Sequence, residues 1–322
     1  MIKVYPLLDT LEILDISDET YFNDCRDYIS NSRLSFINPD QGGSVEKYLA
    51  NEKINSGSLL LGSAVHAEVL QPEEFNIVGG VSRPTAKLGL MADELAKYYL
   101  DGITDDLIIE ASDKVDYYKG KMNESRIADV RDKCLEYWSK RLHTPGDNNM
   151  FLDDVSFIKY KGCVKSIDNN TEIQKLLHPE GLFDEPITKN ELAITIEFRA
   201  VNTETGQVID LPFKAKLDNF SIVDNDTLIL NDLKTTGHLL QDFPDSFEKY
   251  HYYRQMGVYA WLLKLAASKL VNTPINSFTV NMLVVSTVPE FYSQVFRVKH
   301  SDIIRGFNEF KYLLHKVAEI YV

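Results

Sequence analysis

Two aspartates and a lysine in the second half of the chain have the types and the spacing of a metal-assisted hydrolytic site. Asp218 ends the segment KAKLDNF, and Asp232 and Lys234 follow in LILNDLKTTG. Hard cations such as Mg²⁺ or Mn²⁺ bind carboxylate oxygens and keep positions open for water and for a phosphate oxygen. A lysine beside such a cation can orient the attacking water or help to deprotonate it. The set therefore has the chemistry that phosphodiester hydrolysis requires.

The sequence around these residues predicts an antiparallel meander of three strands. The alternation of apolar and polar residues covers residues 191–201, 207–223 and 226–236. Residues two apart on a strand point to the same face, so Asp232 and Lys234 project together. A hairpin partner brings Asp218 beside them. In the alternative interpretation, Asp232 and Lys234 are a solvated cross-strand pair at the edge of a sheet.

The remaining elements predict an α/β (α+β) fold with a central mixed sheet flanked by helices. After a mostly helical region and a loop-rich one, the second half alternates strands and helices. We expect helices over residues 85–143, 246–271 and 301–320, and loops from 144 to about 190. We interpret the chain as one domain, with a helical N-terminal part at 1–185 and a mixed-sheet catalytic core at 186–322.

The strand motif resembles the signature of the PD-(D/E)XK nucleases, in which a carboxylate on one strand is followed by D/E-x-K on the next. Here the two elements read KLDNF and NDLKTT, and DLKTT is similar to the form found in RecE-like (lambda-exonuclease-like) phage recombination exonucleases. The resemblance implies a restriction-endonuclease-like core. It covers motifs within about residues 29–75 and 190–260.

The expected long helix carries a second part of the resemblance. The segment YRQMGVYAW places Gln255 and Tyr259 four residues apart, hence on one helix face. The resemblance implies that these two side chains lie beside the active site and help to hold the DNA end, with the adjacent Arg254 as a further DNA contact. Without the neighbouring motifs, a helix that buries Tyr259 and exposes Gln255 would explain the same pattern.

An upstream histidine and a further acidic residue complete the set that the resemblance implies. The segment LLLGSAVHAEVLQPEEF is similar to the family's Gly-[Ser/Thr]-Ala-x-His motif and places His66 near the metal site. A lone histidine in an apolar helix is otherwise usually a core residue. Glu191 fits the family's additional metal-proximal glutamate, with Glu197 as the alternative, because six residues along a strand keep the same face. The backbone carbonyl of Leu233 is a further candidate ligand.

Residues 85–180 carry no motif of the family. Arg83 and Lys87, in SRPTAKLG, are candidate phosphate contacts at the start of this region, although a basic pair next to a proline is also typical of a polar loop. The net charge of −14 weighs against nucleic-acid binding unless positive charge is concentrated in one channel.

The cysteines and the hydropathy pattern limit the cofactors and the compartment. Cys25, Cys134 and Cys163 form no CxxC pair, and none follows Cys163. We therefore expect no iron–sulfur cluster of the kind bound after the Gln/Tyr helix in related nucleases, and Mg²⁺ (or Mn²⁺) as cofactor. No apolar run of about 18 residues and no signal-peptide pattern occur, so we expect a cytoplasmic protein without a membrane association.

The function that the resemblance implies is a metal-dependent DNA exonuclease. By analogy with the family, it would digest one strand of a linear duplex end from 5′ to 3′ and leave 3′ overhangs for phage-type recombination. A single-strand annealing protein as partner and a homo-oligomeric ring around DNA are also implied by the family alone. The alternatives are an endonuclease or single-strand nuclease on the same fold, and a non-catalytic module that binds DNA ends or a partner.

Overall fold

The protein folds into two compact units that are interleaved along the sequence. In this computed structural model the described residues are 1–14, 16, 18–23, 25, 27–51, 57–81, 83–99, 101–118, 120, 122–144, 148–182, 184–271 and 275–322. The sheet unit comprises Met1–Glu52, Ser166–Val288 and Tyr292–Val322, and the helical unit comprises Lys53–Lys165 and Pro289–Phe291. The predicted limits at 185 and 186 differ from these, and the interpretation as one domain stays a prediction.

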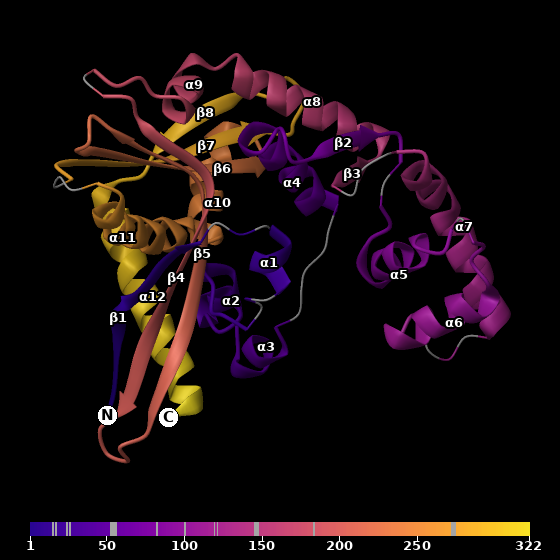
Figure 1. The fold of residues 1–322 in the computed structure, drawn as a ribbon, viewed down its shortest axis with the longest axis horizontal. Helices are drawn as coiled ribbons and strands as arrows, with labels where there is room; N and C mark the ends of the chain where they lie inside the picture. The colour runs from indigo at the N-terminus through magenta and orange to yellow at the C-terminus, as the bar shows by residue number, and fades with distance from the viewer. Residues whose placement is uncertain are drawn as a thin grey trace. The chain divides into compact units, whose positions relative to one another are not determined.

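A six-stranded mixed sheet forms the centre of the sheet unit (Figure 1). Its order is β1-β4-β5-β6-β7-β8. Every neighbouring pair of these described strands is antiparallel except β6 and β7, which are parallel. The strands are β1 (Ile2–Leu14), β4 (Ile187–Asn202), β5 (Val208–Val223), β6 (Thr227–Thr236), β7 (Ser277–Ser286) and β8 (Ser293–Arg297).

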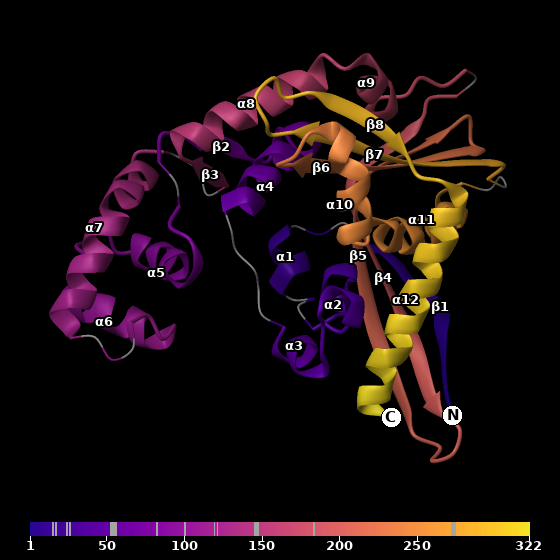
Figure 2. The ribbon, with the colours of Figure 1, turned by 180° about the vertical axis from the view of Figure 1, so that it is seen from behind.

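Two long helices, α11 (Tyr252–Leu270) and α12 (His300–Tyr321), pack together and cover the core of this unit. Figures 1 and 2 both show α12 running along β1, β4 and β5, with the two chain termini at the same end. Phe198 on β4, Phe213 on β5 and Phe310 on α12 meet there at ring-centroid distances of 5.1 to 6.2 Å. These buried aromatic rings join the helices to the sheet.

The helix expected over residues 246–271 is divided in the structure. Helix α10 (Phe243–Lys249) ends just before α11 begins, and His251 between them has a left-handed backbone with φ of +52°. A left-handed residue cannot continue a right-handed helix, so the chain changes direction there. The prediction of a single helix was wrong for this physical reason, whereas the predicted helix over 301–320 is confirmed as α12.

Short elements complete the sheet unit around the long strands and helices. They are the helices α1 (Asp18–Asn23), α2 (Asn31–Ser35), α3 (Val45–Ala50) and α9 (Thr171–Leu177), and the 3-10 turns η1 (Pro39–Gln41) and η2 (Leu240–Asp242). Helix α9 contacts β5, β6 and β8.

The helical unit has its own hydrophobic core. Met91, Ile108 and Trp138 are among its fully buried side chains, and the Trp138 indole donates a hydrogen bond of 2.8 Å to the carbonyl of Ala92. The unit is built from α4 (Gly57–Leu70), α5 (Ala86–Ala96), α6 (Asp105–Lys114), α7 (Asn123–Leu142), the parallel strands β2 (Asn76–Gly79) and β3 (Asn149–Leu152), and most of α8 (Asp154–Asp168).

The predicted fold class is confirmed by this arrangement. A mixed sheet is flanked by helices, and the meander β4–β5–β6 is antiparallel as expected. The helical pattern at 85–143 is confirmed by α5, α6 and α7. The loop-rich region expected up to 190 was wrong in part, because it contains α8 and α9. Among the described residues, none of the helices is both long and apolar enough to cross a membrane.

Candidate metal centre

Three acidic residues occupy one register position on three neighbouring strands. On β4 and β5, Asn190 pairs with Asn219 and Leu192 pairs with Leu217, so the position between them sets Glu191 opposite Asp218. On β5 and β6, the backbone pairing ends with Asn219 and Asn231, and Asp218 and Asp232 are the next residues on the two strands. We call Glu191, Asp218 and Asp232 the acid row. Asp218 and Asp232 both act on the ammonium of Lys234, so the row concentrates negative charge.

The strands β5 and β6 separate at Asp218. Their backbone pairing ends at Asn219 and Asn231, and beyond it the Asp218 carboxylate accepts a hydrogen bond of 2.8 Å from the Leu233 N–H. The carbonyl of one strand residue points to the same side as its N–H. The Leu233 carbonyl therefore faces the gap, where Lys234 Nζ lies 3.4 Å away. The backbone of Leu233 thus lies at the site, and its role as a metal ligand stays a prediction.

Asp232 and Lys234 lie together on β6, as the alternation of the strand predicts. The Lys234 ammonium lies 2.6 Å from a carboxylate oxygen of Asp232. The other oxygen of Asp232 accepts a hydrogen bond of 3.0 Å from the side-chain amide of Gln255 on α11. Asp232 is only 1% exposed, so these partners hold a carboxylate that is almost completely removed from solvent. This burial excludes the alternative interpretation, in which Asp232 and Lys234 are a solvated pair at the edge of a sheet.

Glu191 completes the row with an unusual backbone and a second lysine. Its φ is +53°, a left-handed conformation that costs energy for a residue with a side chain. Its carboxylate forms an ion pair of 2.7 Å with Lys216 on β5, and both side chains are largely buried. Potential ligand oxygens of Glu191 and Asp218 lie within 4.8 Å of each other. Two oxygens bound to one divalent cation are about 3 to 5 Å apart, so one cation can join them.

Burial and charge act on the ionisation of this site in opposite directions. Burial raises the pKa of the Asp218 carboxyl, while the Lys234 ammonium and the Leu233 N–H oppose that rise. For Lys234 burial disfavours the charge, but the carboxylates of Asp232 and Asp218 together raise the pKa of its ammonium above the usual value. Lys234 is therefore protonated at neutral pH in this state.

The donor set fits a hard divalent cation. Three carboxylates are balanced by the two ammonium groups of Lys216 and Lys234, which leaves an excess of negative charge at the row. Carboxylate and carbonyl oxygens are the ligands that Mg²⁺, Mn²⁺ and Ca²⁺ prefer. Binding of a cation would relieve the repulsion among the acid row, so the geometry favours a metal centre at this place.

Gln255 and Tyr259, which are both on α11, lie close to the acid row. Gln255 bonds Asp232 directly. Tyr259 is only 9% exposed, it is hydrogen-bonded to Gln255, and burial raises the pKa of its hydroxyl well above the usual range. The pair therefore supports Asp232 from the helix side. Whether the two side chains also hold a DNA end stays a prediction.

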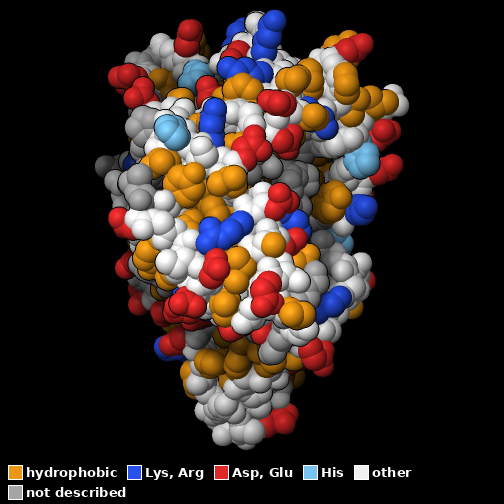
Figure 3. Space-filling model, turned by 90° about the vertical axis from the view of Figure 1, so that its right-hand side faces the viewer, with side chains coloured by type: hydrophobic (Ala, Val, Ile, Leu, Met, Phe, Trp, Pro, Cys, Tyr) orange, Lys and Arg blue, Asp and Glu red, His pale blue; other side chains and the backbone are white. Residues whose placement is uncertain are grey.

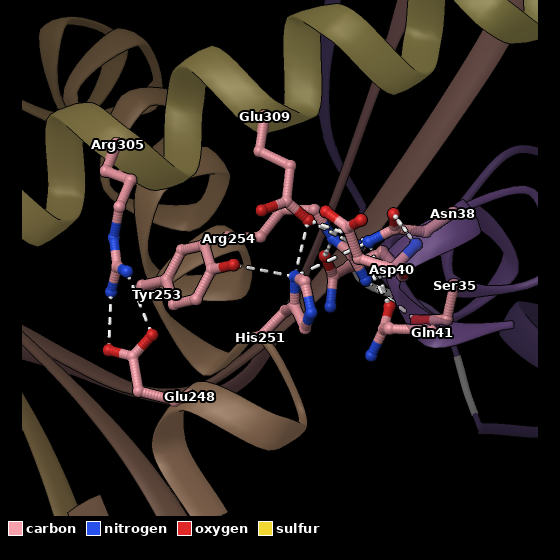
Figure 4. Close-up of polar contacts among 11 residues, drawn as sticks. Ser35, Asn38, Asp40, Gln41, Glu248, His251, Tyr253, Arg254, Arg305 and Glu309 are labelled. Carbon is pink, nitrogen blue, oxygen red and sulfur yellow. Dashed lines mark hydrogen bonds and ion pairs between the residues drawn. The ribbon is translucent and has the colours of Figure 1, made fainter. Parts of the chain in front are cut away.

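Arg254 has a different place from the one that the sequence predicts. Its side chain is completely buried and donates hydrogen bonds to the side chains of Asn31, Ser35, Gln41 and Glu309 at 2.7 to 3.2 Å (Figure 4). We call these five residues the Arg254 cluster. A guanidinium so enclosed has no surface to offer to a DNA phosphate. We therefore correct its assignment from DNA contact to the attachment of the segment around α2 and η1 to α11 and α12.

The other predicted residues of the upstream region belong to the helical unit. His66 is half-buried on α4. Arg83 forms an ion pair of 2.6 Å with Asp93, and Lys87 is exposed and donates a hydrogen bond to the backbone carbonyl of Asp116. The role of His66 as a metal ligand and the phosphate contacts of Arg83 and Lys87 stay predictions, and the pairing with Asp93 reduces the charge that Arg83 can offer.

The strand register distinguishes between the two glutamates that are candidates for the additional metal-proximal residue. Glu197 pairs with Pro212 on β5 and with Leu7 on β1, six residues along β4 from Glu191. At about 3.3 Å per residue, Glu197 lies close to 20 Å from Glu191 along the strand, which is too far for Glu197 to bind the same cation as Asp218. The position opposite Asp218 therefore favours Glu191.

Lys216 was missed by the sequence reasoning, although a signal was present. It stands two residues before Asp218 in KAKLD and could have been counted with Lys234 as a second ammonium near the row. Its partner, Glu191, lies on another strand, so only the register of β4 and β5 reveals the ion pair.

The surface does not repeat the charge pattern of the site. On the face shown in Figure 3, acidic and basic side chains are interspersed, with hydrophobic side chains between them. This mixture agrees with a chain in which 48 acidic residues outnumber 34 basic ones.

Comparison with known proteins gives one similar structure. No family model matches the chain, and no curated protein matches it in sequence. A crystal structure of a protein from Eubacterium rectale, provisionally assigned as an exonuclease, is similar with a TM-score of 0.48 and 11% identity over 96% of this chain and 88% of that one. At this level of similarity, the functional argument rests on the residues of the site.

Proposed function

We propose that the protein is a divalent-metal-dependent deoxyribonuclease, and within that class an exonuclease that degrades one strand of linear duplex DNA. The observation that carries the proposal is the acid row, which brings Glu191, Asp218 and Asp232 to one register position beside Lys234. A site that only bound a partner would have no chemical need for buried carboxylates in excess over their lysines. Their electrostatic repulsion is instead useful for capturing a cation.

The residues that would hold Mg²⁺ (or Mn²⁺) are the acid row and the carbonyl of Leu233. His66, from the helical unit, is proposed as a further ligand on the basis of the motif resemblance. The bound cation supplies a Lewis acid that neutralises phosphate charge and lowers the pKa of a bound water. Gln255 keeps the Asp232 carboxylate in a fixed orientation through their 3.0 Å hydrogen bond.

Lys234 has the properties of a positioning cation. Because nearby carboxylates raise the pKa of its ammonium, it holds the attacking water or a phosphate oxygen by donating hydrogen bonds and is a poor proton acceptor. The water oxygen forms a new P–O bond and gives up a proton to solvent, while the P–O bond to the leaving sugar oxygen breaks and that oxygen takes a proton from solvent. Lys216 would remain near Glu191 and contribute positive charge to the same phosphate.

The finer expectations rest on the motif resemblance alone. They are digestion from 5′ to 3′, production of 3′ overhangs for phage-type recombination, cooperation with a single-strand annealing protein, and a homo-oligomeric ring that encloses duplex DNA. DNA would be recognised mainly through its backbone, because the chain shows no motif that reads bases.

The test is digestion of linear duplex DNA labelled separately at its 5′ and 3′ ends, with Mg²⁺ and with EDTA. We expect metal-dependent release from one end by the wild type and none by Asp232→Ala, whose folding is checked by circular dichroism. Asp245→Ala, at an exposed site on α10, is the matched control and should keep full activity.

Closed circular DNA in the same assay separates the alternatives. Cleavage of circles as fast as of linear duplex would identify an endonuclease, and digestion of single strands alone would identify a single-strand nuclease. The absence of cleavage with Mg²⁺, Mn²⁺ and other divalent cations would contradict the nuclease proposal and favour a binding module.

A further inference from the structure

Four asparagines form a continuous row across β4, β5, β6 and β7. Asn190 pairs with Asn219, Asn219 with Asn231, and Asn231 with Asn281 in the backbone register. Their side chains are hydrogen-bonded in series: the amide of Asn281 donates to Asn231 at 2.9 Å, that of Asn231 to Asn219 at 2.7 Å, and that of Asn219 to Asn190 at 2.7 Å. We call this row the asparagine ladder.

The ladder is buried and internally satisfied. Asn219, Asn231 and Asn281 are at most 2% exposed. The second amide hydrogen of Asn231 is donated to the carbonyl of Leu176 in α9 at 2.9 Å. A buried side-chain amide costs about 1 to 3 kcal/mol when a hydrogen bond is missing. The ladder therefore favours this register, because a slip of β6 by two residues would break the bond between Asn231 and Asn219 and set Asn231 opposite Leu217 or Ser221.

The ladder runs directly beside the acid row. Asn190 precedes Glu191, Asn219 follows Asp218, and Asn231 precedes Asp232 in the sequence. On β6 the two rows lie on opposite faces, because Asn231 contacts α9 whereas Asp232 contacts Gln255 on α11. A hydrogen bond that fixes the asparagines relative to one another therefore also fixes the carboxylates.

The need for such a tie is greatest between β5 and β6. Strand β6 pairs with β7 along its whole length, from Thr227 to Thr236, but with β5 only from Thr227 to Asn231. The bond between Asn219 and Asn231 is thus the last tie between β5 and β6 on the ladder face, whereas on the other face the Asp218 carboxylate accepts a hydrogen bond from the Leu233 N–H. A slip of two residues would keep every apolar side chain on its face but move a carboxylate by about 7 Å.

We propose that the asparagine ladder positions the metal centre, with Asn219 and Asn231 setting the spacing of Asp218 and Asp232. The proposal rests on the function proposed above, because it assumes that the acid row binds a divalent cation. Asn219 and Asn231 are positioning residues that act through the adjacent carboxylates and touch neither cation nor substrate. Asn281, whose neighbour Met282 is no ligand and whose strand is paired throughout, should contribute to stability without tuning the site.

The test is titration of the purified protein with Mn²⁺ alone, measured by calorimetry and by the electron paramagnetic resonance of the bound ion. We expect Asn231→Leu to weaken Mn²⁺ binding at least 10-fold and to alter the resonance of the bound ion. The matched control, Asn281→Leu, removes another member of the buried ladder and should change the dissociation constant less than 2-fold, even if both variants lose similar stability.

The double variant Asn219→Leu/Asn231→Leu covers the case in which the single variant does not fold. It replaces both partners of the bond between β5 and β6 by apolar groups, so Asn219 is not left with an unpaired side-chain oxygen, and the Asn281 amide and the Leu176 carbonyl lose their partner, as in the single variant. It should fold and bind Mn²⁺ at least 10-fold more weakly than the wild type. Binding as tight as in the wild type, or equal weakening in Asn281→Leu, would overturn the ladder's positioning role and leave the metal centre intact. A wild-type protein that binds no Mn²⁺ would instead refute the metal centre and the inference together.

Discussion

The sheet unit holds two buried clusters of charged residues that are built on different principles. In the Arg254 cluster, one guanidinium is enclosed by hydrogen-bond acceptors and by the carboxylate of Glu309. In the acid row, the ammonium groups of Lys216 and Lys234 form ion pairs with Glu191 and Asp232, and Asp218 is a third carboxylate beside them. Among the described residues, the second cluster thus brings several carboxylates together, whereas in the first a single carboxylate accompanies the guanidinium.

This difference indicates that the buried charges of the Arg254 cluster stabilise the fold, whereas those of the acid row serve the function. Burial lowers the pKa of Arg254 and the Glu309 carboxylate opposes this, so the pair offsets much of its own desolvation. In the acid row, burial raises the pKa of Asp218 despite the nearby lysine, which marks a carboxylate kept in an unfavourable environment. Perturbed groups of this kind cluster at functional sites. Changes in the first cluster should therefore affect folding, and changes in the second should affect catalysis.

The largest effect is expected from Asp232→Ala. Loss of this carboxylate should reduce cleavage of linear duplex DNA by at least about 10⁴-fold, because a metal ligand and the partner of Lys234 disappear together. The variant should still fold, because Asp218 remains beside Lys234 and offsets part of the lost ion pair. Loss of folding together with activity would mean that Asp232 belongs with the structural cluster.

Arg254→Leu should have the opposite profile. It leaves Glu309 without its guanidinium partner in a largely buried place, which should cost about 3 to 5 kcal/mol of unfolding free energy. Mn²⁺ binding by the folded fraction should be unchanged. The matched control is Arg305→Leu, which removes a more exposed ion pair with Glu248 that is also drawn in Figure 4 and should cost about 1 kcal/mol or less. Equal costs in urea denaturation would remove the distinction between the two arginines.

The two lysines of the acid row should differ in their contribution to turnover. Lys234→Ala is expected to lower kcat by about 10²- to 10³-fold, with a smaller effect on Mn²⁺ affinity, since it acts on the water or the phosphate. Lys216→Ala should lower kcat by less than about 10-fold, because the ion pair of Lys216 is with Glu191 and not with Asp232. Single-turnover kinetics with both variants measure this, and unchanged kcat in Lys234→Ala would exclude Lys234 from the reaction.

Asp218→Asn should give the smallest effect on stability, and in the stabilising direction. A raised pKa means that the ionised carboxylate is less favourable in the folded than in the unfolded chain, so Asp218 destabilises the metal-free protein above its folded pKa. The asparagine should add about 1 kcal/mol to the unfolding free energy at pH 7. This gain should shrink as the pH falls through the raised pKa, because Asp218 then becomes neutral in the wild type as well.

Urea denaturation without metal at pH 7 and at pH 4 measures this dependence. A variant that is less stable than the wild type at pH 7 would show that the Asp218 carboxylate stabilises the fold in its ionised form. The same raised pKa predicts that Mn²⁺ binding by the wild type weakens on acidification at a higher pH than an ordinary aspartate would cause.

The parts of the site that follow from local periodicity could be predicted from the sequence. Asp232 and Lys234 share a face because they are two residues apart on β6, and the short turn before β6 brings β5 and Asp218 beside them. The mixed sheet followed from the order of strand and helix patterns. These features depend on residues close in sequence, where the periods of strands and helices carry the information.

The parts that depend on distant packing could not be predicted in the same way. Arg254 looks like a free cation in the sequence, and only its packing against Asn31 and Gln41, more than 200 residues away, shows that it is enclosed. The break between α10 and α11 depends on a single left-handed residue, His251. The asparagine ladder requires the register of four strands, although each of three asparagines stands beside an acid in the printed sequence.

The most direct test of the metal centre is a crystal of the protein grown with Mn²⁺ and measured at the manganese absorption edge. The account predicts one strong anomalous peak within about 2.5 Å of carboxylate oxygens of Glu191, Asp218 and Asp232, with the Leu233 carbonyl as a further ligand. No peak should occur at the Arg254 cluster. A crystal that contains Mn²⁺ only at other places, or none at all, would contradict the central claim that the acid row is a cation site.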